Sequence, residues 1–457
     1  MNPGKHYSLN FDSAAGLLAG FIVLLVGAVI LVGSQIGIRV TTQLSTENTV
    51  GPFSPLTLVF SEPVDEALVI EKLLIQPEVK GTFNWMDAKT LRFIPTEPFE
   101  PDLTYKLVLT PGPLTTNGIL LKKPKSWNFR VRPALVAYLV VDSNQSRLWT
   151  VESDTGKTNP LTDKSFRIFD FDTSRDGEFV IFSVFNEQQG MDLWRVDRDG
   201  SDIVLLLECG SDRCSVPAIS PDRRSVAYVR EAADPNPSVQ FGAPRIWLLN
   251  IESKEDAPLY EDQQVLGYKP VWSPDGTHLS SFDGLADEIR LLNLATGEQL
   301  IIPSQKGNPV TWSGDSSTFV YIDIETNGSG SRTQIRSANL VTNETTTIFG
   351  EKDDRDYYYN SLAWSPVENA LVIGLRFEED SSAEALWLMD PARHDGQVIA
   401  SQPDYVYNSP YWDPWGKALV FQQFNLRGAY EPEIGLWKPE MEAPQVLANG
   451  MMAHWLP

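Results

Sequence analysis

The sequence predicts an all-β protein made of one N-terminal transmembrane helix, a small β-sandwich and a seven-bladed β-propeller. Three observations predict it: an uncharged apolar run near the N-terminus, short alternating strands broken by Pro and Gly, and a unit of roughly 46 residues that recurs to the end of the chain. The predicted parts are residues 1–44, 45–132 and 133–457.

Composition limits the function classes. The 457 residues carry 37 basic and 60 acidic side chains, a formal charge of −23, and 42% of them are hydrophobic. A chain this apolar is folded, and its acidity argues against a nucleic-acid binder, which needs a basic surface for phosphate. Four scattered histidines (His6, His278, His394 and His454) and two cysteines argue against a zinc cage.

The first part contains the membrane candidate. No charged residue occurs from Ser13 to Ile38, and the core Leu17 to Gly33 is apolar. About 20 such residues span a bilayer, so an uncleaved anchor is expected. A cleaved signal peptide is the alternative, although the run exceeds the usual apolar region and no A-x-A site follows. The expected protein is single-pass, with its short tail cytoplasmic and its bulk extracytoplasmic.

The two cysteines support export. Cys209 and Cys214 are separated by four residues, a spacing compatible with a disulfide that closes a loop in an oxidising compartment. Two free thiols are the alternative. A metal site made from this pair lacks further ligands nearby.

The second part has the pattern of a half-buried sheet. Thr104 to Leu109 alternates polar and apolar residues, and six or seven such strands suggest a β-sandwich. The motifs Phe60-Ser-Glu-Pro-Val64, Leu91-x-Phe93-x-Pro95 and Trp127-x-Phe129 resemble the bacterial Ig-like domains (SbsA type) of surface-layer and other exported proteins. That resemblance implies a spacer or adhesive module without chemistry.

The third part is built from repeats. A short strand runs into a turn, best seen in Pro270-Val-Trp-Ser-Pro-Asp-Gly276, where Pro, Asp and Gly suit a type I turn. Another string recurs seven times, at Leu148-Trp149, Leu193-Trp194, Ile246-Trp247, Ile289-Arg290, Ile335-Arg336, Leu386-Trp387 and Leu436-Trp437. Four strands in each unit are typical of a propeller blade.

The ends of this part predict how the ring closes. The first unit opens directly with its second strand, Leu135 to Leu139, whereas Met452 to Pro457 resembles a first strand with nothing after it. The C-terminus is therefore expected to supply the innermost strand of the first blade, which gives seven blades.

The repeats resemble the TolB-like propeller family, marked by P-x-W-S-P-D-G and D-L-W-x-[VL]-[DN]. The resemblance spans Pro133 to Pro457, with Asp192 to Asp197 as the best example of the second motif. The fifth and sixth blades depart from the first motif, and seven blades exceed the six of TolB itself. These departures put the partner contacts of TolB in doubt, but not the architecture.

Nothing in the motifs predicts catalysis. There is no G-x-S-x-G elbow and no suitably accompanied histidine, so the chain is expected to be no enzyme and to need no cofactor. Asp197, Asp199 and Asp202 hint at structural calcium, but the full ligand series is missing and a hairpin loop explains them better.

Binding is expected at loops on the rim of the ring, because Tyr and Arg are favoured at binding hot spots. Solvated loops that bind nothing are the alternative. The candidate residues are Arg167, Arg213, Tyr268, Lys269, Tyr357, Tyr358, Tyr359, Tyr407, Asn408 and, in a turn, Trp415.

The functional expectation follows from these parts. It is a membrane-anchored, extracytoplasmic, non-enzymatic interaction protein that presents its propeller for protein binding in an envelope or membrane complex. A glycan- or cell-wall-binding sensor is the alternative, and a propeller hydrolase or lyase using rim carboxylates is a third. The propeller carries 25 basic and 49 acidic residues, which favours a basic or metal-rich partner surface.

Overall fold

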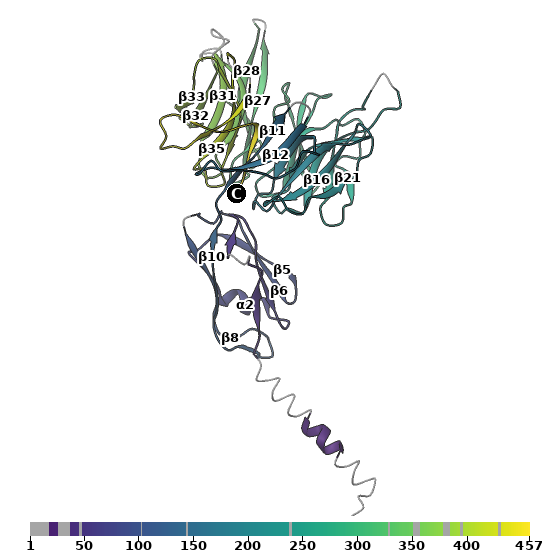
Figure 1. The fold of residues 1–457 in the computed structure, drawn as a ribbon, viewed down its shortest axis with the longest axis vertical. Helices are drawn as coiled ribbons and strands as arrows, with labels where there is room; N and C mark the ends of the chain where they lie inside the picture. Colours follow the sequence, from purple (N-terminus) through teal and green to yellow (C-terminus); the bar gives the residue numbers. More distant parts are fainter. Residues whose placement is uncertain are drawn as a thin grey trace, which may run out of the picture. The chain divides into compact units, whose positions relative to one another are not determined.

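The computed structural model describes residues 18–25, 37–44, 48–101, 103–142, 145–236, 240–327, 330–350, 357–377, 384–393, 396–427 and 431–457 (Figure 1). Strands dominate these residues, as the sequence predicts. The chain divides into two compact units. The first comprises Met1–Val50, Ser54–Glu97 and Asp102–Arg130, and the second comprises Gly51–Phe53, Pro98–Pro101 and Val131–Pro457.

The first unit contains two four-stranded sheets. One has the order β1 (Val40–Thr42), β3 (Leu56–Phe60), β6 (Thr90–Pro95) and β5 (Gly81–Asp87). The other has the order β2 (Thr49–Val50), β10 (Lys125–Val131), β7 (Thr104–Leu109) and β4 (Leu73–Gln76). A small ladder joins β8 (Gly112–Pro113) to β9 (Leu120–Leu121), and the helix α2 (Glu66–Lys72) precedes β4.

Alternation of polar and apolar residues builds the core of this unit. In β7, Tyr105, Leu107 and Leu109 are buried whereas Thr104 and Lys106 are exposed, so one face of the strand packs inward. Tyr105 stacks on Phe129 of the neighbouring strand β10, with ring centroids 5.4 Å apart. The alternation of polar and apolar residues in the sequence therefore determines which face of the sheet is buried.

The membrane prediction is wrong on the described residues. Most of the run from Leu17 to Gly33 lies outside them, and residues 18–25 form a helix. Eight helical residues extend about 12 Å, against the ~30 Å of a hydrocarbon core. No helix in the described ranges combines the length and apolar character needed to cross a membrane. The single-pass localisation, with a cytoplasmic tail and an extracytoplasmic bulk, is therefore not supported.

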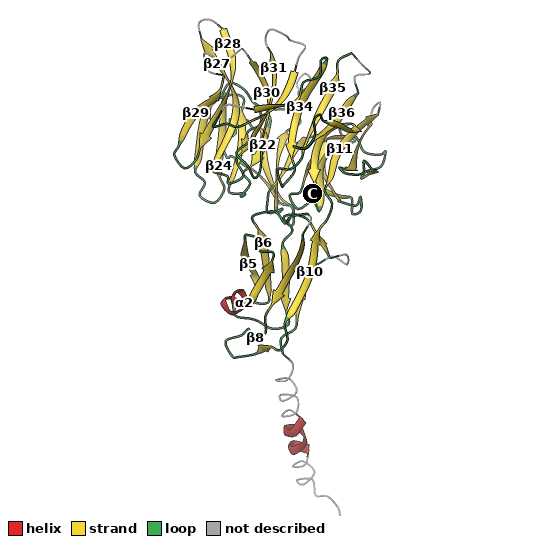
Figure 2. Cartoon of the chain, turned by 90° about the vertical axis from the view of Figure 1, so that its left-hand side faces the viewer, coloured by secondary structure: helices red, strands yellow, loops and turns green. Residues whose placement is uncertain are grey.

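Within its described residues, the second unit holds five separate four-stranded sheets and one eight-stranded sheet (Figure 2). One separate sheet joins the two ends of the unit, in the order β13 (Thr158–Pro160), β12 (Gln145–Glu152), β11 (Leu135–Asp142) and β38 (Met451–Leu456). Two more follow in chain order: β22 (Tyr268–Trp272), β23 (His278–Asp283), β24 (Glu288–Asn293) and β25 (Gln299–Pro303), and then β26 (Thr311–Trp312), β27 (Thr318–Asn327), β28 (Gly330–Asn339) and β29 (Glu344–Phe349). The last two are β30 (Tyr357–Trp364), β31 (Leu371–Phe377), β32 (Glu384–Met389) and β33 (Gly396–Ala400), and then β34 (Tyr405–Trp412), β35 (Leu419–Asn425), β36 (Pro432–Trp437) and β37 (Gln445–Asn449).

The eight-stranded sheet consists of two groups of four strands. The first group is β14 (Ile168–Thr173), β15 (Phe179–Phe185), β16 (Met191–Asp197) and β17 (Val204–Leu207); the second is β18 (Arg213–Ile219), β19 (Ser225–Glu231), β20 (Arg245–Asn250) and β21 (Asp256–Pro258). A single parallel pair, Met191 with Arg213, joins the groups. Each group is otherwise an antiparallel meander, like the separate sheets.

The Ser-Pro-Asp-Gly turns link the first two strands of a meander. In the turn after β22, Ser273 Oγ donates to Asp275 Oδ1 at 2.5 Å, and Gly276 N donates to Ser273 O at 2.9 Å. Gly276 has φ +74°, a conformation that glycine adopts without steric cost. The turn after β18 uses the same bonds, although Arg223 takes the left-handed position at φ +63°.

The first strands of the meanders contact one another around a ring. β18 contacts β14 and β22, β30 contacts β26 and β34, and β38 contacts β34 and β14. Tryptophan side chains tie these neighbours together: Trp272 Nε1 donates to Ala218 O at 2.9 Å, Trp412 Nε1 to Ala363 O at 3.2 Å, and Trp455 Nε1 to Tyr411 O at 3.1 Å. These three Trp side chains therefore pack in the core and also bond the adjacent sheet.

The C-terminal strand closes the ring. β38 pairs antiparallel with β11, with Leu456 opposite Leu135 and His454 opposite Ala137. Arg198 then holds the end of β38, because its Nη1 donates to the carbonyl oxygens of Leu456 at 2.5 Å and Pro457 at 2.8 Å. Gly177 lies so close to the end of the chain that a Cβ there would overlap the carbonyl group of Pro457.

Replacing Arg198 tests this closure. We expect Arg198→Gln to lower the free energy of unfolding by about 2–4 kcal/mol, because it leaves several partly buried carbonyl oxygens without their charged donor. Urea unfolding followed by tryptophan fluorescence measures the change. Arg393→Gln, which removes an exposed ion pair to Asp390, is the control and should cost less than about 1 kcal/mol. Equal losses in the two variants would contradict the role of Arg198.

The tryptophans supply a second, matched test. Trp272 Nε1 is bonded to the neighbouring sheet, whereas Trp312 Nε1 is buried without a hydrogen-bond partner among the described residues. Trp272→Phe should therefore destabilise the protein by about 1 kcal/mol more than Trp312→Phe, since only the first loses a hydrogen bond. Thermal and urea unfolding of both variants give the difference. A larger loss in Trp312→Phe would show that indole bonding does not join the sheets.

Candidate functional site

Cationic and aromatic side chains gather at one edge of the second unit, where the first strands begin. In an antiparallel meander the start of the first strand and the end of the second lie at the same edge. Tyr358 and Lys269 are the second residues of β30 and β22, and Arg376 is the last but one residue of β31. Lys306 lies in the segment that leads to β26. We call Lys269, Lys306, Tyr358 and Arg376 the cationic cluster.

The tyrosine ring at the centre of this cluster is open to solvent. Tyr358 is 43% exposed. Lys306 Nζ lies 4.3 Å and Arg376 Cζ lies 5.0 Å from the centroid of its ring, both within the range of cation–π attraction. Lys306 Nζ also donates to Tyr359 O at 2.9 Å, which fixes the ammonium beside the ring. Two cations therefore converge on one exposed aromatic ring.

Lys269 adds positive charge to the same place. Burial and then the nearby ammonium of Lys306 lower the pKa of Lys269. Within the described part of the chain, neither lysine nor Arg376 has a carboxylate oxygen within 4 Å. Among the described residues, no ion pair relieves the repulsion between the ammonium groups of Lys269 and Lys306, and an anion bound beside them would relieve it.

An acidic side chain at the border of the cluster is held by the fold. Glu384 opposes Arg376 in the ladder between β31 and β32. Its Oε2 accepts from Asn360 Nδ2 at 3.3 Å and from Tyr407 N at 3.2 Å. Burial raises the pKa of Glu384, and the bond from Tyr407, the charge of Arg376 and the bond from Asn360 oppose that rise. Glu384 therefore joins two adjacent sheets.

The other predicted rim residues divide into exposed and buried ones. Arg167 is exposed over the ring of Phe185, at 4.3 Å, and Arg213 lies over Phe241, at 3.8 Å. Tyr268 is partly exposed beside Lys269. The side chain of Tyr357 lies outside the described residues.

Tyr359, Tyr407 and Trp415 are not available at the rim, contrary to the prediction. Tyr359 and Tyr407 are buried because alternate side chains of β30 and β34 point into the sheet packing. Asn408 is half-buried, and its Oδ1 has no partner among the described residues. Trp415 follows the far end of β34 and is buried in the second unit, where its Nε1 donates to Phe99 O at 2.9 Å. These residues contribute packing, so the open part of the rim is smaller than expected.

The cysteine pair and the aspartates near Asp197 have structural positions. Cys209 and Cys214 form a buried disulfide. Asp192 Oδ1 accepts from Cys209 N at 2.8 Å, which explains an aspartate before Leu193-Trp194. Asp199 Oδ1 accepts from Ser201 N and Oγ in a hairpin turn. No group of three metal-ligating side chains occurs among the described residues, and structural calcium remains an untested expectation.

A histidine–aspartate pair that the sequence did not reveal lies between first strands of neighbouring sheets. His454 Nδ1 lies 3.5 Å from Asp172 Oδ1, and its ring stacks on Tyr411 with centroids 4.7 Å apart. The three residues come from β38, β14 and β34. They are far apart in the sequence, and only closure of the ring brings them together, so no motif signals them.

Asp170 and Asp172 connect β14 to the next meander. Asp170 Oδ2 accepts from Val216 N at 2.7 Å, and Asp172 Oδ2 accepts from Ile219 N at 2.8 Å. Burial is the main cause that raises the pKa of Asp170 to about 6, although the bonds from Ser183 and Val216 oppose it. The folded chain therefore holds a proton on Asp170 at a pH where the unfolded chain has lost it.

This shift predicts a pH-dependent stability. Between about pH 4 and pH 6 the folded state binds more protons at Asp170 than the unfolded state, whose carboxyl has the ordinary pKa of 3.8. The stabilisation that comes from proton binding at Asp170 is complete below pH 4 and is lost as the pH rises through 6. Relative to Asp170→Asn, the wild-type free energy of unfolding should fall by about 2–3 kcal/mol from pH 4 to 7. Urea titrations at each pH measure it, with the exposed Glu344→Gln as control; parallel pH curves for wild type and Asp170→Asn would refute it.

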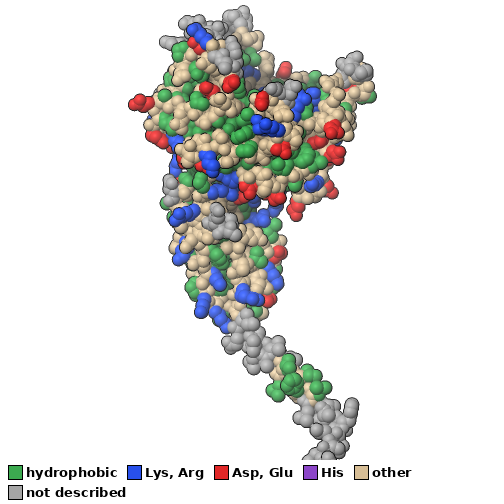
Figure 3. All heavy atoms as spheres, in the orientation of Figure 1, with side chains coloured by type: hydrophobic (Ala, Val, Ile, Leu, Met, Phe, Trp, Pro, Cys, Tyr) green, Lys and Arg blue, Asp and Glu red, His purple; other side chains and the backbone are tan. Residues whose placement is uncertain are grey.

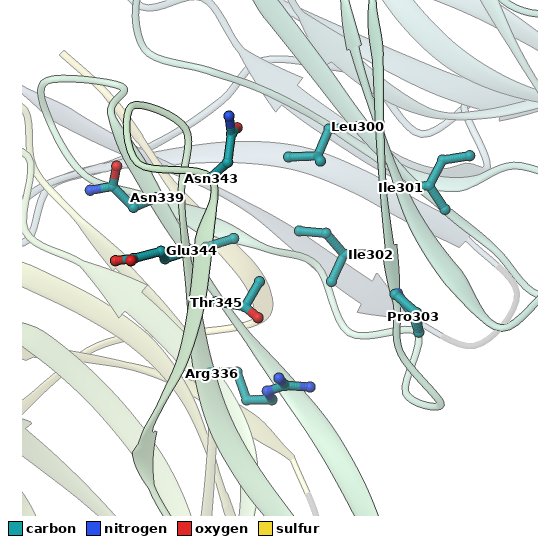
Figure 4. Close-up of a pocket in the computed structure, with 10 residues that line it drawn as sticks. Leu300, Ile301, Ile302, Pro303, Arg336, Asn339, Asn343, Glu344 and Thr345 are labelled. Carbon is teal, nitrogen blue, oxygen red and sulfur yellow. The ribbon is translucent and has the colours of Figure 1, made fainter.

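A separate cavity of about 360 Å³ lies between β25 and the hairpin β28–β29 (Figure 4). Leu300 and Ile302 point into it, whereas Ile301 and Glu344 point away. Arg336 lies at its border, and its Nη1 is 3.4 Å from Asp323 Oδ2. The cavity thus offers an apolar wall and an arginine that is already paired, which is less suited to binding charge than the cationic cluster.

Comparison with known proteins identifies the fold and nothing finer. No family model and no curated protein matches the sequence. Among solved structures, TolB from Acinetobacter baumannii is 14% identical, with a TM-score of 0.42 over 71% of this chain and 83% of its own. A structure from a study of two prolyl endopeptidases is 11% identical, with a TM-score of 0.53 over 71% of this chain and 50% of its own. An oligogalacturonate lyase from Vibrio parahaemolyticus is 14% identical, with a TM-score of 0.47 over 69% of this chain and 85% of its own.

Of these three structures, the prolyl endopeptidase alone has a TM-score above 0.5, and its likeness supports a β-propeller fold and corrects two predictions. The chain was expected to be no enzyme and to act as a non-enzymatic interaction protein, with glycan binding as the alternative. The prolyl endopeptidase is an enzyme, so missing sequence motifs do not exclude catalysis on this fold. The exclusion was wrong because a propeller can assemble side chains from separate blades, as His454 and Asp172 illustrate here.

Proposed function

We propose that this chain is a ligand-binding, seven-bladed β-propeller, preceded by an Ig-like sandwich, that recognises an acidic peptide segment of a protein partner at the cationic cluster. One observation carries the proposal: Lys306 and Arg376 converge on the exposed ring of Tyr358, beside Lys269. Lysine and arginine bind carboxylates, and the aromatic face adds contact area that loses little entropy on binding.

The charge around the cluster makes it distinctive. The propeller has 49 acidic and 25 basic residues, a net charge of −24, and Figure 3 shows acidic side chains interspersed with basic ones over the face in view. Acidity of the whole unit favours basic partners, as expected from the sequence. A cluster of three cations within such a unit instead selects a ligand that presents carboxylates at one place, because most other approaches are repelled.

Ionic strength separates the attraction of an anion to the cationic cluster from its repulsion by the acidic residues of the whole unit. At 0.15 M salt the Debye length is about 8 Å, so the distant acidic residues are largely screened. A carboxylate in direct contact with Lys306 or Arg376 would lie well within one Debye length of the cation and would be screened much less. Binding at the cluster should therefore be measurable at physiological salt and should not require low ionic strength.

Fluorescence anisotropy with a labelled, amidated hexaglutamate peptide tests the proposal. The wild-type chain should bind this probe at about 0.15 M salt, and Lys306→Gln combined with Arg376→Gln should weaken binding at least tenfold. Loss of two charge-assisted contacts, each worth about 1.5 kcal/mol or more, accounts for that factor.

The matched control replaces a lysine far from the cluster. Lys254 is exposed and donates to Leu205 O at 3.0 Å, and Lys254→Gln removes the same charge without touching Tyr358. It should leave affinity for the probe unchanged. The proposal fails if the wild type does not bind hexaglutamate, or if the control weakens binding as much as the double variant.

A further inference from the structure

One strand of the first unit is exposed along nearly its whole length. β5 is the last strand of its sheet and pairs only with β6 among the described strands. Five of its seven residues are exposed, and they include Phe83 at 36% and Met86 at 46%. Such an edge presents unpaired N–H and C=O groups that can accept another strand.

Some other outer edges carry a protecting residue that β5 lacks. In the second unit, β13, β21 and β25 end in Pro160, Pro258 and Pro303, and proline cannot donate to an added strand. β5 reads Gly-Thr-Phe-Asn-Trp-Met-Asp and contains no proline, lysine or arginine. An aromatic edge without these protections is a pairing surface.

The apolar surface continues beside β5. Four residues connect the end of β4 to the start of β5, so the outer edges of the two sheets lie on the same side of the sandwich. Leu74 of β4 is 46% exposed and Ile70 of α2 is 38% exposed. In Figure 2, α2 and β5 are on the same side of this unit. We call β5 with Ile70 and Leu74 the open edge.

We infer that the open edge pairs with the open edge of a second copy of this chain, with β5 antiparallel to its symmetry mate. Charge selects this occupant. Two propellers of net charge −24 repel each other, whereas residues 45–132 carry ten acidic and ten basic side chains. The neutral sandwich is where two copies approach at the least electrostatic cost. A twofold axis then buries the same patch on both copies.

The regular part of β5 sets the register. The ladder with β6 shifts between Trp85 and Asp87, so Met86 forms a bulge and only Gly81 to Trp85 is regular. A symmetric antiparallel pairing of five residues centres on the third, which is Phe83. Phe83 then faces its own mate, Thr82 faces Asn84, and Gly81 faces Trp85. No like charges oppose each other in this register.

Cysteine cross-linking of the full chain in mild detergent tests the pairing and its register. Phe83→Cys should form a disulfide-linked dimer under mild oxidation, because a residue on the twofold axis lies within about 5.5 Å of its mate. Thr82→Cys alone should not, since it faces Asn84, whereas Thr82→Cys combined with Asn84→Cys should. The native cysteines are already joined to each other and do not interfere.

Sedimentation velocity supplies an independent measurement. The wild type should show a concentration-dependent dimer, and Phe83→Lys should shift it to monomer by placing two ammonium groups on the axis, with thermal unfolding confirming that the variant is folded. A monomeric wild type together with no cross-link in Phe83→Cys, or a cross-link equally strong in Thr82→Cys alone, would overturn the inference. Hexaglutamate binding does not depend on this edge, so the two proposals can fail separately.

Discussion

The antiparallel pairing of β38 with β11 is the constraint on which the second unit depends. A four-stranded meander cannot bury both of its faces alone, and it does so only against its neighbours. The last strand of the chain therefore completes the first sheet, and Arg198 holds its end through the carbonyl oxygens of Leu456 and Pro457. Without this pairing, the sheets at the two ends would each leave an apolar face in water.

The inner strands that hold the ring together also place the chemistry. Trp272, Trp412 and Trp455 bond the backbone of the preceding sheet, and Asp170 and Asp172 bond the backbone of the following group. Lys269 and Tyr358 are the second residues of two of these strands. The cationic cluster therefore rests on the most tightly connected layer of the fold, which keeps its charges at fixed positions before a ligand arrives.

The sequence located part of this cluster and missed part of it. Lys269 and Tyr358 were expected as candidate binding residues on the rim of the ring. Lys306 and Arg376 were not, since their importance lies in reaching Tyr358 from separate sheets. Conversely, Tyr359 and Tyr407 looked like rim residues but face inward. A one-residue step along a strand reverses the direction of the side chain, and the sequence does not reveal where a bulge changes that alternation.

By itself, the sequence determined the local structure: strands from the alternation of polar and apolar residues, turns from Ser-Pro-Asp-Gly, and a repeating unit from the recurrence of both. These depend on contacts between residues close in the chain. The tertiary structure decided what depends on contacts between distant segments, namely the cations around Tyr358, the approach of His454 to Asp172, the burial of Trp415 and the exposure of β5. Each of these depends on which strands become neighbours in the fold, and the sequence around a residue does not specify those neighbours.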